Sequence, residues 1–428
     1  MTEPTTSAFK WVTALSTRPS LEAAVNEVVS QAQTDLAATA NLAIVFISSA
    51  FASEYSRLMP LLKEKLQSPD LPLIGCAGGG VIGMKSPEVA QEVEGEPALA
   101  LTLAYLPDIE IHTFHVSTDE LPDLDSPPTA WVELTGASPS HQPHFILLAD
   151  PFSSKVNDLL QGLDFAYPSS TKVGGLAGAG AGNGPSGLFC DYELYRDGVV
   201  GVALSGNIVL EAIVAQGCRP IGQPYLVTEG ERNILLGLEE HPSTSGVTYS
   251  GSSRVSQKRT PLELLQDLIQ SLDEDDRALA QHSLFVGVAQ SEFKQTLEPG
   301  DFLIRTLLGV DPRVGAIAIG DRIRVGQRIQ FHLRDGDASA DDLETLLERY
   351  CHQHEEDRSP VVGALMFACL GRGEGLYGEP NFDSELFHHY LPKIPLSGFF
   401  CNGEIGPVGG STFLHGFTSV FGIVRQVK

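Results

Sequence analysis

Arg372, Asn402 and Glu404 bring a cation, an amide and an anion into two short glycine-rich stretches of the sequence, CLGRG and GFFCNGEIG. A guanidinium can bind a ligand carboxylate through two parallel N–H donors, and a carboxylate can accept hydrogen bonds from a ligand ammonium group. If the two stretches lie side by side, Arg372 and Glu404 could hold the charged ends of an amino acid. The alternative is an Arg372–Glu404 ion pair that only fixes the loop, and the sequence leaves both interpretations open.

Glycines surround these polar residues and recur in two other parts of the chain. A glycine-rich turn lets a ligand approach the backbone, and its N–H groups can bind a carboxylate or a phosphate. The candidate ligand-binding residues are therefore the polar residues together with neighbouring and corresponding glycines and cysteines: Arg372, Gly373, Gly398, Cys401, Asn402, Gly403, Glu404, Gly75, Cys76, Gly174 and Gly175. For each glycine, a tight turn or close strand packing is the alternative.

Cysteines near predicted strand ends offer a different chemistry. A cysteine hydrolase or transferase would use Cys76 or Cys401 as nucleophile, with His332 or His415 as base. No local nucleophile signature accompanies these cysteines, and cysteine is often a small buried hydrophobe. We therefore assign no catalytic residue and expect no enzyme, and the cysteine enzyme stays the alternative.

Metal and cofactor signals are weak throughout the sequence. The six cysteines have no CxxC spacing, and the paired histidines fall in helical, acidic surroundings. The segment GEGLYG, 373–378, matches a dinucleotide-binding pattern, but it is followed by Pro380 and Asn381, and no acid ends the next predicted strand. We expect neither a disulfide framework nor a metal site, and no cofactor.

The elements that must position these residues form a unit that occurs three times. Each copy has an apolar run, a helix-compatible segment and a glycine-rich stretch. The apolar runs are 42–49, 145–151 and 363–373, the helical segments are 54–67, 155–166 and 383–390, and the glycine-rich stretches are 71–83, 170–184 and 394–406. Aligning LPLIGCAGGGVIG with IPLSGFFCNGEIG takes a two-residue shift. Strand-helix-strand units of this kind predict a parallel or mixed sheet whose loops gather at the carboxyl ends of its strands.

Three further β-rich segments contain turn-forming residues and predict antiparallel hairpins: 98–116, 198–217 and 316–335. A capped amphipathic helix is expected from Thr260 to Leu272, after a stretch rich in Ser, Thr and Gly. The fold class is therefore α/β, with mixed sheets built from repeated strand-helix-strand units and antiparallel hairpins. Two domains are predicted, 25–228 and 229–428.

Composition excludes several classes of protein. The chain has 428 residues, 42% of them hydrophobic and 19% charged, which is typical of a globular protein. A net charge of -26 argues against general binding to nucleic acid or to anionic membranes. No apolar run reaches membrane-spanning length, and the first residues lack a basic segment followed by an apolar core. We expect a cytoplasmic protein.

Several segments resemble the FIST family, a sensory domain of signal-transduction proteins. They are VGGLAGAG with the preceding DPFSSKVNDLLQGLDFAYP, then DGVVGVALSG, and CLGRG followed by IPLSGFFCNGEIGPVGG. Gly398, Gly403 and Glu404 match the GF-x-x-x-GEI motif of the family, and Arg372 matches its GRG. The resemblance covers a FIST N-terminal region, 25–228, and a FIST C-terminal region, 229–428.

The resemblance implies a ligand-binding sensory module whose ligand is an amino acid or a derivative. No kinase, cyclic-dinucleotide enzyme or F-box segment is visible in the sequence, so we expect the protein to signal through a partner. The hypothesis is a cytoplasmic sensor of a small polar metabolite. The alternatives are the cysteine-dependent hydrolase or transferase and a ligand-free acidic scaffold that meets a basic partner.

Overall fold

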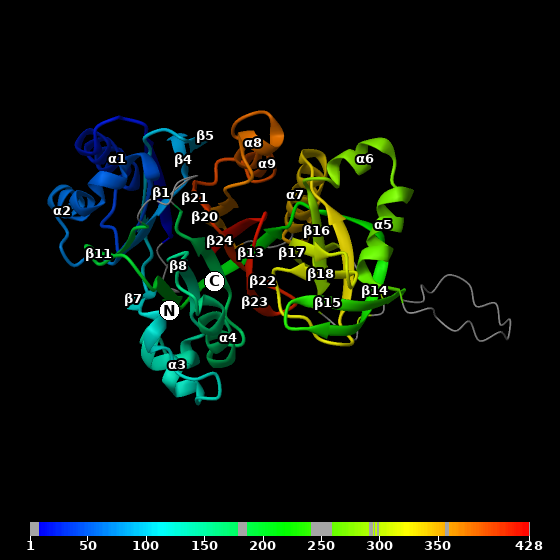
Figure 1. Cartoon of the computed structure of the whole chain (residues 1–428). Helices are drawn as coiled ribbons and strands as arrows, with labels where there is room; N and C mark the ends of the chain where they lie inside the picture. The colour runs from blue at the N-terminus through cyan, green and yellow to red at the C-terminus, as the bar shows by residue number, and fades with distance from the viewer. Residues whose placement is uncertain are drawn as a thin grey trace. The chain divides into compact units, whose positions relative to one another are not determined.

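The computed structural model describes residues 8–178, 186–240, 259–290, 294, 296–297, 299–355 and 359–427. The chain forms two compact units (Figure 1). Unit 1 contains Met1–Ala215 and Leu343–Lys428, and unit 2 contains Gln216–Asp342. This division differs from the predicted segments 25–228 and 229–428, because unit 2 is inserted between two strands of unit 1.

Three six-stranded mixed sheets build unit 1. Sheet 1 has the order β1 (Lys10–Ser16), β6 (Leu99–Tyr105), β2 (Leu42–Ser48), β3 (Leu73–Gly78), β10 (Leu188–Cys190) and β11 (Glu193–Tyr195). Sheet 2 has the order β7 (Glu110–Val116), β12 (Val199–Ser205), β8 (His144–Ala149), β9 (Lys172–Leu176), β22 (Glu404–Val408) and β23 (Ser411–His415). Sheet 3 has the order β13 (Ile208–Ala215), β24 (Ser419–Gln426), β20 (Val361–Cys369), β21 (Leu396–Cys401), β4 (Gly80–Ser86) and β5 (Val89–Glu94).

The three sheets share one topology, so unit 1 consists of three repeats: 10–105, 110–205, and 208–215 with 343–426. Four strands of each sheet come from one repeat, and the last two are a hairpin from another repeat. The first repeat gives β4–β5 to sheet 3, the third gives β22–β23 to sheet 2, and the second gives β10–β11 to sheet 1. The repeats therefore exchange hairpins in a closed cycle, and the threefold repetition predicted from the sequence is confirmed.

Corresponding glycines pack at the centre of each parallel strand pair. In register, Val45 faces Gly75, Leu147 faces Gly174 and Met366 faces Gly398. A Cβ atom on these glycines would lie 2.1, 1.8 and 1.8 Å from the carbonyl oxygen of the facing residue. The glycines are therefore needed for close strand packing. Their positions also align 71–83 with 394–406 without a gap, so the two-residue shift assumed from the sequence was wrong.

Helices cover the outer faces of the sheets, while the inner faces share a core. Helices α1 (Leu21–Leu36) and α2 (Tyr55–Leu66) pack on sheet 1, and α3 (Pro128–Thr135) and α4 (Val156–Ala166) on sheet 2. On sheet 3 lie α9 (Phe382–Tyr390) and the part of α7 (Gly336–Gln353) that belongs to unit 1, with α8 (Glu374–Tyr377) before α9. Short 3-10 turns are Ser49–Glu54, Thr118–Glu120 and Pro139–His141. The predicted helices 54–67, 155–166 and 383–390 are confirmed.

The predicted hairpins at 98–116 and 198–217 are wrong. Strands β6 and β7 follow each other across a short turn, but β6 lies in sheet 1 and β7 in sheet 2. Likewise β12 lies in sheet 2 and β13 in sheet 3. These turns lead from the last strand of one repeat to the first strand of the next, and the same turn residues suit either connection.

Unit 2 is a closed barrel. Its strand order is β14 (Arg219–Glu231), β15 (Ile234–Glu240), β18 (Ala316–Ile319), β17 (Phe302–Asp311), β16 (Leu284–Ala289) and β19 (Arg328–Leu333). Helices α5 (Pro261–Ser271) and α6 (Glu274–Leu279) and the turn Pro299–Asp301 complete it. Thr260 forms a capping box with Glu263, so the predicted helix is confirmed, whereas β18 and β19 are not neighbours and the third predicted hairpin is wrong.

The α/β class with mixed sheets, strand-helix-strand units and hairpins is confirmed. In the described residues, no helix combines the length and the apolar character that crossing a membrane requires.

Candidate functional site

Three strand-end turns meet in unit 1, one from each repeat. Backbone hydrogen bonds join them from Gly79 N to Phe400 O (3.1 Å), from Asn402 N to Leu176 O (3.1 Å) and from Gly178 N to Ala77 O (3.0 Å). Each donor lies at the same position after the packed glycine of its repeat, and so does each acceptor. The three bonds therefore form a closed cycle, which we call the strand-end ring (residues 77–79, 176–178 and 400–402).

Glycines let backbone and side chains approach closely in and beside this ring. A Cβ atom on Gly178 would lie 3.2 Å from Gly79 N, and one on Gly175 would lie 2.5 Å from Cys401 Sγ. The side chain of Asn402 is the polar group at the surface of the ring, and its Nδ2 lies 3.4 Å from Ala177 O. The ring thus presents the exposed amide of Asn402, with Gly79 partly exposed as well.

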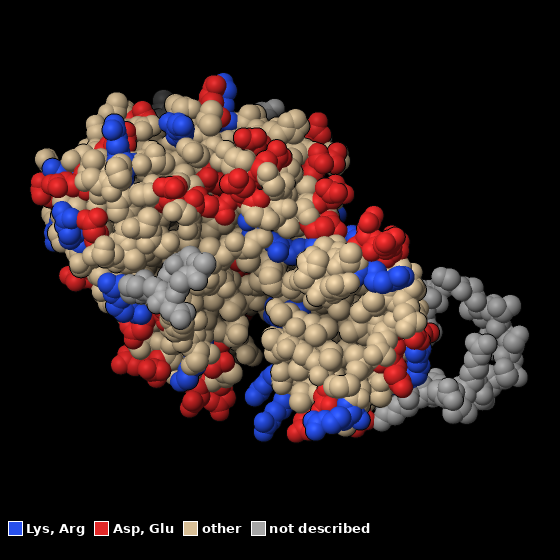
Figure 2. All heavy atoms as spheres, turned by 45° about the horizontal axis from the view of Figure 1, so that its top comes forward, with Lys and Arg blue, Asp and Glu red and all other residues tan. Residues whose placement is uncertain are grey.

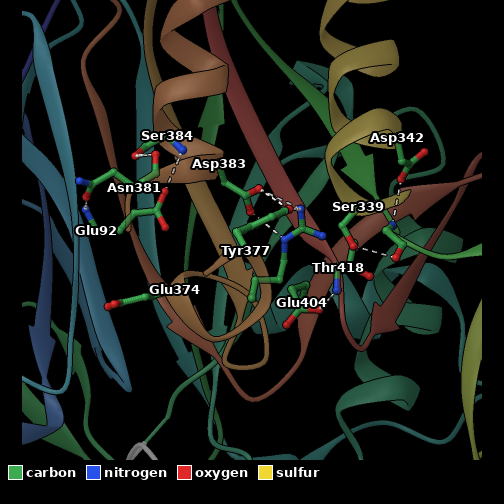
Figure 3. A network of polar contacts seen from close by, with 12 residues as sticks. Glu92, Ser339, Asp342, Glu374, Tyr377, Asn381, Asp383, Ser384, Glu404 and Thr418 are labelled. Carbon is green, nitrogen blue, oxygen red and sulfur yellow. Dashed lines mark hydrogen bonds and ion pairs between the residues drawn. The ribbon is translucent and has the colours of Figure 1, made fainter. Parts of the chain in front are cut away.

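Arg372 lies in the turn after β20 and is 1% exposed. Its Nε and one terminal nitrogen donate to the two carboxylate oxygens of Asp383 at 2.7 and 2.9 Å, and it also donates to the hydroxyl of Tyr377. Tyr377 in turn donates to Asp383 at 2.8 Å, and Figure 3 shows these two side chains pointing toward each other. This buried bidentate ion pair fixes the guanidinium, so Arg372 stabilises the turn from the interior and is not exposed on its surface.

Glu404 is also fully buried, at the start of β22. Its Oε2 accepts a hydrogen bond from Thr418 N at 3.0 Å, which ties the exchanged hairpin to the start of β24. The corresponding residue in the first repeat is Val81, because both side chains stand at the same place after the packed glycine. The third repeat therefore has a carboxylate at the position where the first repeat has an apolar side chain.

The two candidate nucleophiles are fully buried. Burial raises the pKa of the Cys76 thiol and that of the Cys401 thiol well above the ordinary value. Cys401 Sγ donates to Phe399 O at 3.5 Å inside the core that the three sheets share. Both sulfurs are thus protonated thiols in an apolar interior, which argues against their use as nucleophiles.

The structure gathers only part of the predicted site. Gly175, Cys401, Asn402 and Gly403 lie in or against the ring, with Leu176 N donating to Gly403 O at 2.7 Å. Gly75, Gly174 and Gly398 lie within the strand pairs, with Cys76 beside Gly75. Gly373 lies just before α8 at φ 66°, and a Cβ there would lie 2.2 Å from a Glu94 oxygen. The turn of Arg372 joins the ring through Leu370 N, which donates to Cys401 O at 2.9 Å.

Sequence reasoning missed several residues around this site. Gly79 and Gly178 were inside the glycine-rich stretches, but their place in the ring depends on which strands are neighbours. Asp383 and Tyr377 were in or beside a predicted helix, and an acid in the first turn of a helix soon after Arg372 was the available signal. Glu92, which accepts a hydrogen bond from Ser384 N beside Asp383, gave no signal in the sequence, because it lies in β5 of the first repeat, far from Arg372 along the chain.

Comparison with known proteins matches both halves of the chain to one family. The FIST N domain matches residues 41–241, and the FIST C domain matches residues 261–407. The chain belongs to the FIST family. FIST domains are sensory domains of signal transduction. The FIST N segment runs from the first repeat into β15 of the barrel, and the FIST C segment runs from α5 into β22, so both segments cross between the compact units.

Relatives of this FIST protein extend over nearly its whole length. An uncharacterized protein of Mycobacterium tuberculosis is 34% identical over 409 residues, 95% of this chain and 97% of the relative. An uncharacterized protein of Mycobacterium bovis is 32% identical over 406 residues, 94% of this chain and 95% of the relative. Human F-box only protein 22 is 50% identical over 43 residues, 10% of this chain and 11% of that protein.

Proposed function

We propose that this FIST protein senses a small polar metabolite, an amino acid or a derivative, at the strand-end ring, and passes the signal to a partner protein. The observation that carries the proposal is the meeting of three glycine-lined strand ends in one closed hydrogen-bonded cycle. Ligands of α/β proteins bind preferentially at the carboxyl ends of parallel strands. The choice of an amino acid rests on the family.

The predicted site residues take two roles in this proposal. Asn402 contacts the ligand directly, since its amide is exposed on the ring and can both donate and accept. Gly403 and Gly175 are buried beneath it and let the neighbouring strands pack closely. Arg372 and Glu404 are positioning residues, because both are buried and hold the turns on either side.

A thermal-shift screen of the full chain against amino acids and their derivatives tests the proposal. A ligand at 100 times its Kd stabilises the folded state by about 2.7 kcal/mol. We expect a hit whose affinity falls about tenfold or more in Asn402→Ala, and does not change in Asn157→Ala, a matched change at an exposed position of α4. A hit bound equally by both variants would place the ligand elsewhere. A flat screen would favour the acidic scaffold.

A further inference from the structure

The hairpin β4–β5 is held in sheet 3 by polar contacts with the segment that contains α8 and α9. Asn381 Oδ1 accepts from Glu92 N at 2.8 Å, Glu92 Oε1 accepts from Ser384 N at 2.8 Å, and Glu94 Oε1 accepts from Glu374 N at 3.0 Å. Figure 3 shows Glu92, Asn381 and Ser384 side by side. We call this contact the Glu92 joint, and it links the first repeat to the third.

Two carboxylates are buried at this joint, and the guanidinium of Arg372 pairs with that of Asp383. Glu92 is 5% exposed, and its neighbour Asp383 is fully buried and occupied by Arg372. Glu92 Oε2 has no hydrogen-bond partner among the described residues. A second negative charge in this place would be buried with one oxygen unpaired, which is costly.

The other ionisable groups around Glu92 do not compensate its charge. Glu94 follows on the same strand, Glu374 and Tyr377 come from α8, and Asp383 comes from α9. Arg372 is the cation among them, and it holds Asp383. Figure 2 shows acidic side chains gathered in patches on one face of the molecule. Glu379 and Glu385, in the segment of α8 and α9, are exposed. The negative charges of Asp383 and Glu94 favour a proton on Glu92.

The corresponding joints of the other two hairpins differ from this one. At β22–β23, Asp164 accepts from Thr412 N at 2.6 Å and from its hydroxyl at 2.8 Å, and Lys172, 1% exposed, pairs with Asp164 at 2.9 Å. At β10–β11, Asp191 accepts from Leu73 N at 3.2 Å and is exposed. Asp164 thus pairs with a buried cation, and Asp191 is exposed to solvent. Glu92 has neither.

We propose that Glu92 is a proton-operated latch: the joint closes when its carboxyl carries a proton, and ionisation releases the segment of α8 and α9 from β5. Burial and the nearby Asp383 raise the pKa of Glu92 to about 7, so the proton is lost near neutral pH. Because this pKa is raised, closure is strongest below the ordinary value of 4.5 and weakens as the pH rises to about 7, after which it changes no further.

The latch also regulates ligand binding at the strand-end ring, a consequence that rests on the proposed function. Asp383 and Tyr377 lie in the released segment and hold Arg372, whose turn bonds to the ring through Leu370 N. Ionisation of Glu92 therefore loosens one wall of the site and weakens binding as the pH rises.

Hydrogen exchange of the full chain, corrected for the intrinsic rate at each pH, tests the latch without any ligand. In the wild type, protection of amides in β5, α8 and α9 should fall by about 10- to 20-fold between pH 5.5 and 7 and then level off. Opening gains up to about a factor of ten per pH unit while only the closed state binds the proton, and this gain fades as the pH nears 7. Glu92→Gln copies the protonated acid and should remove this slope. Glu385→Gln, an equal change of charge at an exposed position of α9, should keep it.

A wild-type segment whose protection does not change with pH would overturn the latch, and so would an unchanged slope in Glu92→Gln. Carbonyl NMR titration of Glu92 in the wild-type chain gives an answer even if the variant does not fold: a pKa near 7 supports the latch, and one near 4.5 overturns it. Neither readout depends on a ligand, so a failed screen for metabolites would count against the proposed function and not against the latch.

Discussion

Arg372 and Glu404 were selected from the sequence because a charge among glycines is unusual, and both lie close to the strand-end ring. Their burial changes what they do. The guanidinium of Arg372 donates hydrogen bonds to both carboxylate oxygens of Asp383. Glu404 accepts a hydrogen bond from the backbone N–H of Thr418. A sequence shows that a charged residue stands in an apolar stretch, but burial and partner depend on residues far along the chain, so the predicted ligand clamp was an interpretation that the sequence could not test.

Arg372→Ala should destabilise unit 1 by about 3–5 kcal/mol, because it leaves the carboxylate of Asp383 buried without its cation. Denaturant unfolding of the full chain measures the change. Arg57→Ala is the matched control, since the Arg57–Glu54 pair of the same unit is exposed and should contribute no more than about 1 kcal/mol. Equal effects of the two substitutions would contradict a structural role for the Arg372 pair.

Alkylation of the folded chain at neutral pH should leave Cys76 and Cys401 unmodified while Cys351 reacts. Burial raises the pKa of the first two thiols far more and closes them to reagent, whereas Cys351 is partly exposed. Peptide mass spectrometry after timed labelling measures the rates, and labelling in denaturant provides the control in which all three react alike. Fast, selective labelling of Cys401 would restore the cysteine enzyme as the better hypothesis.

The strand-helix-strand units were predictable because their signals are local. An apolar run, an amphipathic helix and a glycine-rich strand stand within one short segment, and α2, α4 and α9 were found in this way. The partners of the hairpins were not predictable, because β4 pairs with β21 and β22 with β9 across most of the chain. Turn residues between β6 and β7 gave no sign that these strands belong to different sheets.

Gly398→Ala should prevent β20 and β21 from closing, since the new methyl group would meet the Met366 carbonyl oxygen at 1.8 Å. Overpacking of this kind costs about 1–3 kcal/mol, and we expect the upper end here because the neighbour is backbone. Gly375→Ala in α8, where nothing lies within 4 Å, should change the stability by no more than about 1 kcal/mol. Chemical denaturation compares the two, and a mild effect of Gly398→Ala would show that the strand pair is looser than its register indicates.

The two ends of the inserted segment that forms unit 2 lie close together. Gly217 N donates to Asp342 Oδ2 at 3.0 Å, and Ser339 Oγ donates to Gly217 O at 2.9 Å, so the two ends of the insertion are side by side within the unit. The predicted division at residue 228 falls inside β14 of unit 2. The linear sequence gives no direct sign that one domain is inserted into another, so we divided the chain into two consecutive segments.

Replacing residues 216–342 with a short Gly/Ser linker should leave unit 1 folded. Its three sheets contain no strand from the insertion, and Leu343 and Leu347 would still fill the core beneath the rest of α7. Circular dichroism and hydrogen exchange would check the shortened chain, with one cooperative transition expected because the repeats exchange hairpins. A chain that stays unfolded would show that unit 1 depends on the barrel.

The cyclic exchange of hairpins delays the completion of two sheets while the chain is synthesised on the ribosome. Sheet 1 can be finished once Tyr195 has emerged, but sheet 2 waits for His415 and sheet 3 for Gln426. During this time β4 and β5 have left the exit tunnel without the strand they are to join, and an unpaired apolar edge invites aggregation. The hairpin β4–β5 therefore remains an unpaired edge until β21 has been synthesised.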